Sequence, residues 1–186
     1  PNTMRKIINS TFITLDGAVE NPHMWPSLSG ASDESYAIEM QLLEACDVVL
    51  MGRRTYDVFA PVWSARSGDA YSDRINAMQK VVVSRTLANP TWQNTSVISS
   101  DVAGAIGRLK QQSGMSIVQY GIGQVTNLML ENGLVDEFRL WIHPLILGRN
   151  GPDVPHFRQS PPTQLRLTGS RPLANGVVLM TYAAHE

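Results

Sequence analysis

The chain has 186 residues, of which 43% are hydrophobic and 17% charged, and its formal net charge is −1. Such a chain can bury the core of one domain, and its charge excludes a general attraction to nucleic acid or to an anionic membrane. It has no apolar run of the roughly 20 residues that a membrane span needs, and a single cysteine, Cys46, excludes an internal disulfide. Together with the absence of a signal-peptide pattern, these properties predict a cytoplasmic protein.

The first two thirds of the chain alternate between strand-like and helix-like segments. Residues 6–15 are β-branched and apolar, which predicts a strand that ends at Asp16-Gly17. Ser32 or Asp33 can cap a helix on which Tyr36, Met40 and Leu43 recur at helical spacing. Further strands are expected at 48–52, 81–83 and 116–120, and further helices around Tyr71, Ile75 and Met78, around Val102, Ile106 and Leu109, and around Val125, Leu128 and Met129.

The pattern changes after Gly133. Residues 138–143 alternate with a period of two, which is typical of a strand with unlike faces, and a proline-rich loop runs from 144 to 162. Strands around 165–167 and 177–180 are joined by an Asn175-Gly176 turn. The sequence therefore predicts an α/β fold whose mostly parallel central sheet is flanked by helices and ends in antiparallel strands, as one domain over residues 4–183.

The turn after the second predicted strand has the features of an anion site. Gly52 allows close approach of the backbone, Arg53 and Arg54 supply permanent charge, and Thr55 can cap the following helix. The free N–H groups of a helix start bind anions. The alternative is an ordinary strand-to-helix turn whose arginines are solvated.

Two further strand ends resemble this turn: Ser84-Arg85-Thr86, and Gly121-Ile122-Gly123-Gln124. The carboxyl ends of parallel strands face one crevice, where ligands usually bind. A dinucleotide with an additional ribose phosphate would explain all three turns, with charge-assisted hydrogen bonds of roughly 1.5–3 kcal/mol each.

Other chemistries have little support in the sequence. The four histidines are scattered and lack metal-ligand spacing, so no metal site is expected. Trp25 is either a lid over a ligand or an anchor of its loop. Asp16 either binds a substrate or forms the Asp-Gly turn, and His143 is expected to be structural.

The joint pattern resembles the dihydrofolate-reductase-like superfamily, in particular the reductase (C-terminal) domain of the riboflavin-biosynthesis protein RibD. The resemblance rests on the opening Leu15-Asp16-Gly17, on Gly52 to Tyr56, on Val82 to Leu87, and on Gly133 to Glu137. Pro144 to Gly148 and Asn175 to Val178 extend it over nearly the whole chain.

The resemblance implies NADPH as hydride donor, a small-molecule substrate and a homodimer. It implies that cofactor phosphates are bound by Gly52, Arg53, Arg54 and Thr55 and that the ribose 2′-phosphate lies near Ser84, Arg85 and Thr86. Gly121, Ile122, Gly123, Gln124 and Val125 would lie along the pyrophosphate and nicotinamide. Phe12, Thr14, Trp25 and Tyr56 would border the substrate, with Asp16 as the candidate catalytic acid.

Two departures affect the expected substrate. The pterin-binding carboxylate of dihydrofolate reductase has no clear equivalent, because Ser35-Tyr36 occupies that region and neither Glu34 nor Glu39 clearly fits. Residues 57–63 replace the ribose-phosphate segment of the riboflavin-pathway reductases, and the pathway deaminase's zinc motifs are absent. We therefore expect a reductase of a small cyclic or heteroaromatic compound, the alternative being a non-catalytic protein that binds a nucleotide or a flavin-like ligand.

The strand at 138–143 also predicts assembly. Its apolar groups on both faces would leave an exposed patch, so either helices or a second subunit must cover the second face. With the implied homodimer, Trp141 is expected near the subunit interface, beneath the 144–162 loop.

Overall fold

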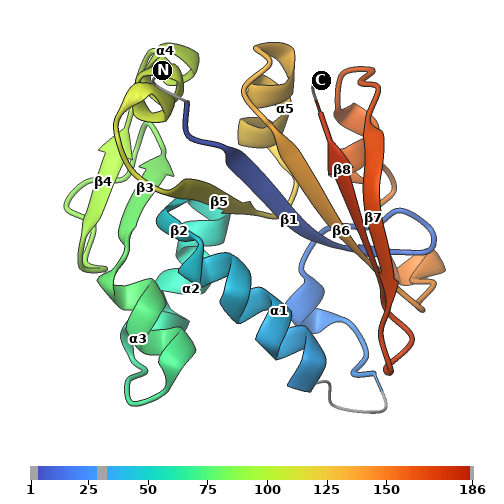
Figure 1. Ribbon diagram of the computed structural model, residues 1–186. Helices are drawn as coiled ribbons and strands as arrows, with labels where there is room; N and C mark the ends of the chain where they lie inside the picture. Colours follow the sequence, from blue (N-terminus) through green and yellow to red (C-terminus); the bar gives the residue numbers. More distant parts are fainter. Residues whose placement is uncertain (1–3, 29–32, 185–186) are drawn as a thin grey trace. The chain divides into compact units, whose positions relative to one another are not determined.

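The computed structural model describes residues 4–28 and 33–184, and within them the chain has an α/β fold (Figure 1). Its strands form a mostly parallel sheet in the order β4-β3-β2-β5-β1-β6-β8-β7, with antiparallel pairs at the C-terminal end. The expected fold class is confirmed. Within the described ranges, no helix is long and apolar enough to cross a membrane.

Contacts divide the chain into two compact units. Of the described residues, unit 1 comprises 4–7 and 39–120, and unit 2 comprises 8–28, 33–38 and 121–184. Helix α1 (Asp33–Glu44) contributes to both. The predicted cofactor and substrate residues are therefore distributed over two units, and each unit has its own internal geometry.

Unit 1 is built around parallel strands. They are β2 (Cys46–Gly52), β3 (Gln79–Val83), β4 (Thr95–Ile98) and β5 (Ser116–Tyr120), and all of their pairings are parallel. The intervening helices are α2 (Arg53–Ser64), α3 (Ala70–Ala77) and α4 (Val102–Gln111), of which α2 packs on α3, β2 and β3. The continuous apolar run 48–51 is buried, as expected for a central parallel strand.

Unit 2 combines one parallel and two antiparallel pairings. Strand β1 (Ile7–Thr14) pairs in parallel with β6 (Glu137–His143), which pairs antiparallel with β8 (Val178–Ala183); β8 in turn pairs antiparallel with β7 (Arg166–Pro172). Helix α5 (Gln124–Glu131) precedes β6. The 144–162 loop contains two short 3₁₀ helices, η2 (Gly148–Asn150) and η3 (His156–Gln159), and a third, η1 (Pro22–Met24), follows β1.

Local signals predicted most of these elements. The turn between β7 and β8 has Gly176 at φ +88°, where glycine avoids strain. Strand β4 was not predicted, because its four half-exposed or exposed residues give too short an apolar pattern. The predicted face of α1 is wrong in part: Ile38, Leu42 and Leu43 are buried, whereas Tyr36 is 48% exposed. The proposed cap Ser32 lies outside the described residues, and Asp33 lies in the first helical turn.

Trp141 lies in the core of unit 2, which corrects its expected place at a subunit interface. It is 1% exposed and packs with Ile38, Leu173, Val177 and Leu179. Its indole Nε1 donates a hydrogen bond to Ser10 Oγ at 2.9 Å. The chain itself therefore covers the face of β6 that carries Trp141.

Candidate functional site

In unit 1, helix α2 begins directly where strand β2 ends. Gly52 is the N-cap residue and provides no side-chain cap, and Arg53 is the first helical residue. Thr55 is the third residue of the helix and not its cap, which corrects the expectation from sequence. The start of α2 therefore keeps N–H groups that can bind an anion.

The two adjacent arginines of α2 have different surroundings. Arg53 donates from Nε to Asp57 Oδ1 at 2.9 Å and from Nη1 to Thr86 Oγ1 at 3.2 Å. Arg54 is exposed and has no hydrogen-bond or ion-pair partner in the described parts of the chain. Arg53 is thus the arginine that lies beside the 84–86 turn, a choice that the sequence left open.

The 84–86 turn is shaped by a side chain of its own. Ser84 is buried, and its Oγ accepts hydrogen bonds from the N–H groups of Thr86 and Leu87 at 3.2 and 3.0 Å. Arg85 is exposed, and within the described residues it has neither a hydrogen bond nor an ion pair. The turn therefore carries one guanidinium group without a described partner, on the residue before the Thr86 to which Arg53 donates.

Tyr56, an expected substrate contact, lies inside unit 1. It is 6% exposed, and its hydroxyl accepts hydrogen bonds from the N–H groups of Thr91 and Trp92 at 3.2 and 3.4 Å. This placement gives Tyr56 a structural role and argues against a substrate contact.

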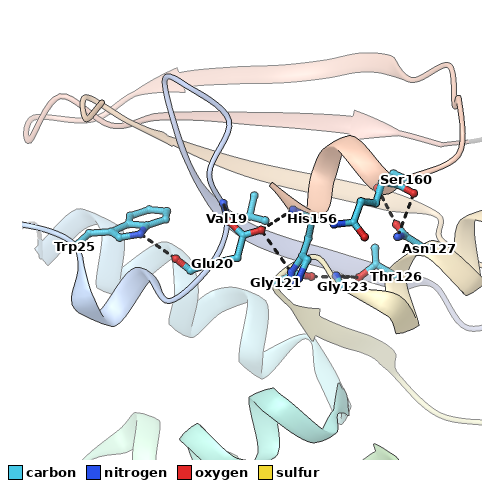
Figure 2. A network of polar contacts seen from close by, with 10 residues as sticks. Val19, Glu20, Trp25, Gly121, Gly123, Thr126, Asn127, His156 and Ser160 are labelled. Atoms are coloured by element: carbon cyan, nitrogen blue, oxygen red, sulfur yellow. Dashed lines mark hydrogen bonds and ion pairs between the residues drawn. The ribbon is translucent and has the colours of Figure 1, made fainter. Parts of the chain in front are cut away.

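In unit 2, the glycine turn before α5 is held at both of its glycines. The carbonyl of Gly121 accepts from Asn9 Nδ2 at 2.8 Å, and the N–H of Gly123 donates to Thr126 Oγ1 at 3.1 Å, as Figure 2 shows for the second bond. Gly121 has φ +83°, which requires glycine. Gly123 has an extended backbone, and a Cβ there would meet nothing within 4 Å. Neither strain nor packing therefore requires glycine at position 123.

The other residues of this turn differ in exposure. Ile122 is buried, Val125 is half-buried, and Gln124 is exposed at the first position of α5. The side chain of Ile122 is therefore closed to a ligand, whereas that of Gln124 is accessible.

Three of the expected substrate residues in unit 2 have defined neighbours. Phe12 and Trp25 both contact the ring of His143, with centroids 4.8 and 5.5 Å from it. Trp25 Nε1 also donates to the carbonyl of Glu20 at 2.9 Å, so Trp25 anchors its loop (Figure 2). Thr14 is buried, and its hydroxyl bonds to Asp16 and to the N–H of Ala18.

Sequence reasoning assigned His143 to structure alone, yet it lies between two expected substrate residues. Its Nδ1 donates to the carbonyl of Trp141 at 2.8 Å, and burial lowers the pKa of its imidazole. The ring is therefore neutral at pH 7. The alternation of β6 could not reveal these ring contacts, because Phe12 and Trp25 come from distant segments.

Asp16 is already engaged by the surrounding chain. Its carboxylate accepts from Thr14 Oγ1 at 2.7 Å, from the N–H of Gly148 at 2.8 Å and from that of Leu147 at 3.2 Å. The hydrogen bond from Thr14, followed by that from Gly148, lowers the pKa of this carboxyl group. Asp16 is ionised at neutral pH, which argues against its expected role as a proton donor.

The 144–162 loop is fastened by polar side chains of unit 2. Glu20 accepts from the N–H groups of Val19 at 3.0 Å and His156 at 2.5 Å, and Asn127 accepts from Ser160 Oγ at 2.8 Å (Figure 2). These bonds join the loop to the segment after β1 and to α5. No group of side chains in the described part of the chain could hold a metal ion.

Comparison with known proteins decides the family. Residues 5–179 match the RibD C-terminal domain. The chain belongs to this family. Two Bacillus subtilis relatives, the uncharacterized proteins YyaP and YwjB, are 28% and 24% identical to it, over 96% and 94% of this chain and 94% and 96% of their own lengths.

Solved structures share the fold of this family member. A protein of Shewanella sp. PV-4, whose name places it in riboflavin biosynthesis, has a TM-score of 0.71 at 20% sequence identity. The match covers 97% of this chain and 99% of that one. A pyrimidine reductase-like protein of Corynebacterium diphtheriae has a TM-score of 0.64 at 15% identity, covering 98% and 92%. The bifunctional deaminase/reductase of Thermotoga maritima has a TM-score of 0.67 at 13% sequence identity. The match covers 98% of this chain and 57% of that one. These likenesses confirm the RibD-like fold.

Proposed function

We propose that the protein is an NADPH-dependent reductase of a small cyclic or heteroaromatic substrate, similar to the reductases of riboflavin biosynthesis. The observation that carries this proposal is the pair of guanidinium groups at the 84–86 turn. Arg53 donates to Thr86, and Arg85 is free among the described residues. Guanidinium groups bind phosphate through paired, charge-assisted hydrogen bonds, and the 2′-phosphate of NADPH offers such a group.

Each unit, taken by itself, carries residues that would suit a part of this cofactor. In unit 1, Arg85, Arg53 and Thr86 would hold the 2′-phosphate, Ser84 would shape their turn, and Gly52, Arg54 and Thr55 would supply further donors at the start of α2. In unit 2, the residues 121–125 would lie along the pyrophosphate and nicotinamide, with open space beside Gly123.

When bound, NADPH supplies a hydride to an electrophilic carbon of the substrate. The neighbouring heteroatom then needs a proton, and we propose an ordered water as its source, because Asp16 is held ionised by its three donors. Asp16 and Thr14 would then position the end of β1, while Phe12 and Trp25 border the substrate together with His143.

Calorimetric titration of the purified protein with NADPH and NADH tests the cofactor. We expect NADPH to bind and to bind more tightly than NADH. If neither binds, the proposal fails; if NADH is preferred, the role of the arginines is wrong.

The alternative is a non-catalytic binding protein on the same fold, favoured by the engagement of Asp16, the one acid that the sequence singled out. Turnover separates the two. Oxidation of NADPH with any of a panel of pterins, pyrimidines, quinones and nitroaromatics supports the reductase. Tight NADPH binding with no turnover supports the binding protein.

A further inference from the structure

Strand β1 carries a buried polar pair on one of its faces. Asn9 and Thr11 are 0% and 1% exposed and lie two residues apart, so their side chains share one face of the strand. The Thr11 hydroxyl donates to Asn9 Oδ1 at 2.6 Å, and Asn9 Nδ2 donates to the carbonyl of Gly121 at 2.8 Å. The pair therefore joins β1 to the glycine turn before α5.

These two hydrogen bonds fix the orientation of the Asn9 amide group. A backbone carbonyl can only accept, so the amide atom that faces Gly121 must be the nitrogen. The amide oxygen then faces Thr11, whose hydroxyl holds it there. Loss of this hydroxyl would leave the amide group free to rotate, so Thr11 sets the direction in which Asn9 donates.

The carbonyl of Gly121 is held from a second side as well. Thr126 Oγ1, in the first turn of α5, lies 3.4 Å from it and accepts from the N–H of Gly123 at 3.1 Å (Figure 2). The peptide bond after Gly121 is trans, so this carbonyl and the N–H of Ile122 point in opposite directions. Because the carbonyl points toward the buried Asn9, the N–H of Ile122 points away from it.

This N–H of Ile122 has no hydrogen-bond partner within residues 4–28 and 33–184. Its two neighbours in the turn do: the N–H of Gly121 donates to the carbonyl of Ser10 at 3.1 Å, and that of Gly123 donates to Thr126. A Cβ on Gly123 would meet nothing within 4 Å, so the space beside the turn is open. A backbone N–H without a protein partner needs water or a ligand. The turn therefore offers one backbone donor.

We propose that Asn9, oriented by Thr11, is a positioning residue: by holding the Gly121 carbonyl, it presents the N–H of Ile122 to an acceptor oxygen of a bound ligand. This inference rests on the proposed function, in which residues 121–125 lie along the cofactor. The acceptor is then an oxygen of the pyrophosphate or of the nicotinamide carboxamide of NADPH. Asn9 and Thr11 act through the backbone of the turn and need not touch the ligand.

The first test measures the backbone itself. Hydrogen exchange of single amides, followed by NMR of the isotope-labelled full chain, compares Ile122 with Gly121. We expect the Ile122 amide to exchange rapidly in the ligand-free protein and at least about tenfold more slowly with saturating NADPH, whereas the bonded Gly121 amide is protected in both. An Ile122 amide that is protected without ligand, or that bound NADPH leaves unprotected, overturns the inference.

A second ligand distinguishes the two acceptor oxygens. 2′-Phospho-ADP-ribose has the pyrophosphate of NADPH but lacks the nicotinamide. If it slows the exchange of the Ile122 amide as NADPH does, the acceptor is a pyrophosphate oxygen. If only NADPH slows this exchange, the acceptor is the carboxamide oxygen. Both results support the inference.

Variants of β1 separate positioning from folding. Thr11→Val removes the hydroxyl that orients Asn9, Thr11→Ser keeps it, and Asn9→Leu removes the amide group. Ser10→Ala is the matched control. The Ser10 side chain lies on the opposite face of β1 and accepts from the buried Trp141, so its loss removes a buried hydrogen bond and leaves those of the glycine turn in place.

Calorimetry should show that Asn9→Leu and Thr11→Val weaken NADPH binding about tenfold, while Thr11→Ser and Ser10→Ala stay within about twofold of the wild type. Denaturant unfolding of the same proteins measures their stability, and Ser10→Ala should be destabilised as Thr11→Val is. Equal losses of affinity in Ser10→Ala and Thr11→Val, or wild-type affinity in Asn9→Leu, would show a purely structural role.

Failure of the wild type to bind NADPH has a separate meaning, because it refutes the proposed function. Amide exchange in the ligand-free proteins then still decides whether the pair sets the turn. In that case we expect the exchange rate of the Ile122 amide to change at least about threefold in Asn9→Leu and to stay unchanged in Ser10→Ala. The same rate in Asn9→Leu as in the wild type would contradict the inference.

Discussion

At the scale of single residues, the arginines of unit 1 differ by their partners. Arg53 bonds to Asp57 and Thr86, whereas Arg85 is free in the described part of the chain. A guanidinium group whose N–H donors are all available can bind a phosphate without breaking an existing hydrogen bond. Arg85 is therefore the most direct mutational probe of the proposed cofactor.

Replacement of Arg85 by alanine should weaken NADPH binding roughly tenfold to a hundredfold and leave NADH binding nearly unchanged. The reason is that only NADPH has the 2′-phosphate, and a charge-assisted hydrogen bond contributes about 1.5–3 kcal/mol. Calorimetry of both cofactors measures the effect, with Arg166→Ala on the exposed strand β7 as the control. Equal losses for both cofactors would assign Arg85 to the shared part of the cofactor or to the fold.

Trp141→Ala should lower the free energy of unfolding by about 3–5 kcal/mol, because it leaves a cavity in the core of unit 2 and an unpaired Ser10 hydroxyl. Denaturant unfolding measures this loss. Leu167→Ala, at a half-exposed position of β7, should change stability by less than about 1 kcal/mol. A small effect of Trp141→Ala would contradict the core assignment.

At the scale of elements, a buried lysine joins the end of α3 to β3. Lys80 is 0% exposed, donates to the last carbonyls of α3 and lies 4.6 Å from the centre of the Trp92 ring. A cation suits the C-terminal end of a helix. Desolvation nevertheless lowers the pKa of Lys80 to about 8.

This pKa predicts a pH dependence of stability. In the unfolded chain, the pKa of Lys80 has its ordinary value of 10.5. Between about pH 8 and 10.5, the Lys80 side chain is therefore protonated more often in the unfolded protein than in the folded protein. Stability due to Lys80 therefore rises with pH in this window. The unfolding free energy of the wild type relative to Lys80→Met should increase by about 1–2 kcal/mol from pH 7 to pH 9.5. A difference that stays flat or falls would show that Lys80 keeps an ordinary pKa.

At the scale of the whole molecule, we expect a homodimer, as the family resemblance implies. The burial of Trp141 removes one argument for it, but β7 ends the strand order and all seven of its residues are exposed. An edge strand of this kind is a ready surface for pairing with a second copy.

Light scattering at micromolar concentration should give about twice the 20.5 kDa chain mass. Because Trp141 lies in the core, a folded Trp141→Phe variant should form an assembly of the same size as the wild type. A wild-type monomer at high concentration would show that the implied assembly does not extend to this chain.

The sequence alone determined the features that depend on neighbouring residues. The apolar run before Gly52, the helical spacings of α3, α4 and α5, and the Asn175-Gly176 turn predicted the α/β fold, because burial periodicity and turn chemistry act over a few residues. The short Thr95–Ile98 strand was not predicted, because its pairing with β3, and not its own residue pattern, marks it as a strand. The family pattern also pointed to the turns in each unit that we propose bind the cofactor.

Only the tertiary structure decided which side chains are available. Asp16 accepts a hydrogen bond from Gly148, which lies 132 residues away in the sequence, and Trp141 donates one to Ser10, which lies 131 residues away. The Tyr56 hydroxyl accepts one from the loop 35 residues later. Arg53 meets Thr86 across 33 residues, while its neighbour Arg54 does not. Local patterns record a side chain's type and face, but not these distant partners. Partners occupied Asp16 and Tyr56 and left Arg85 without a partner among the described residues.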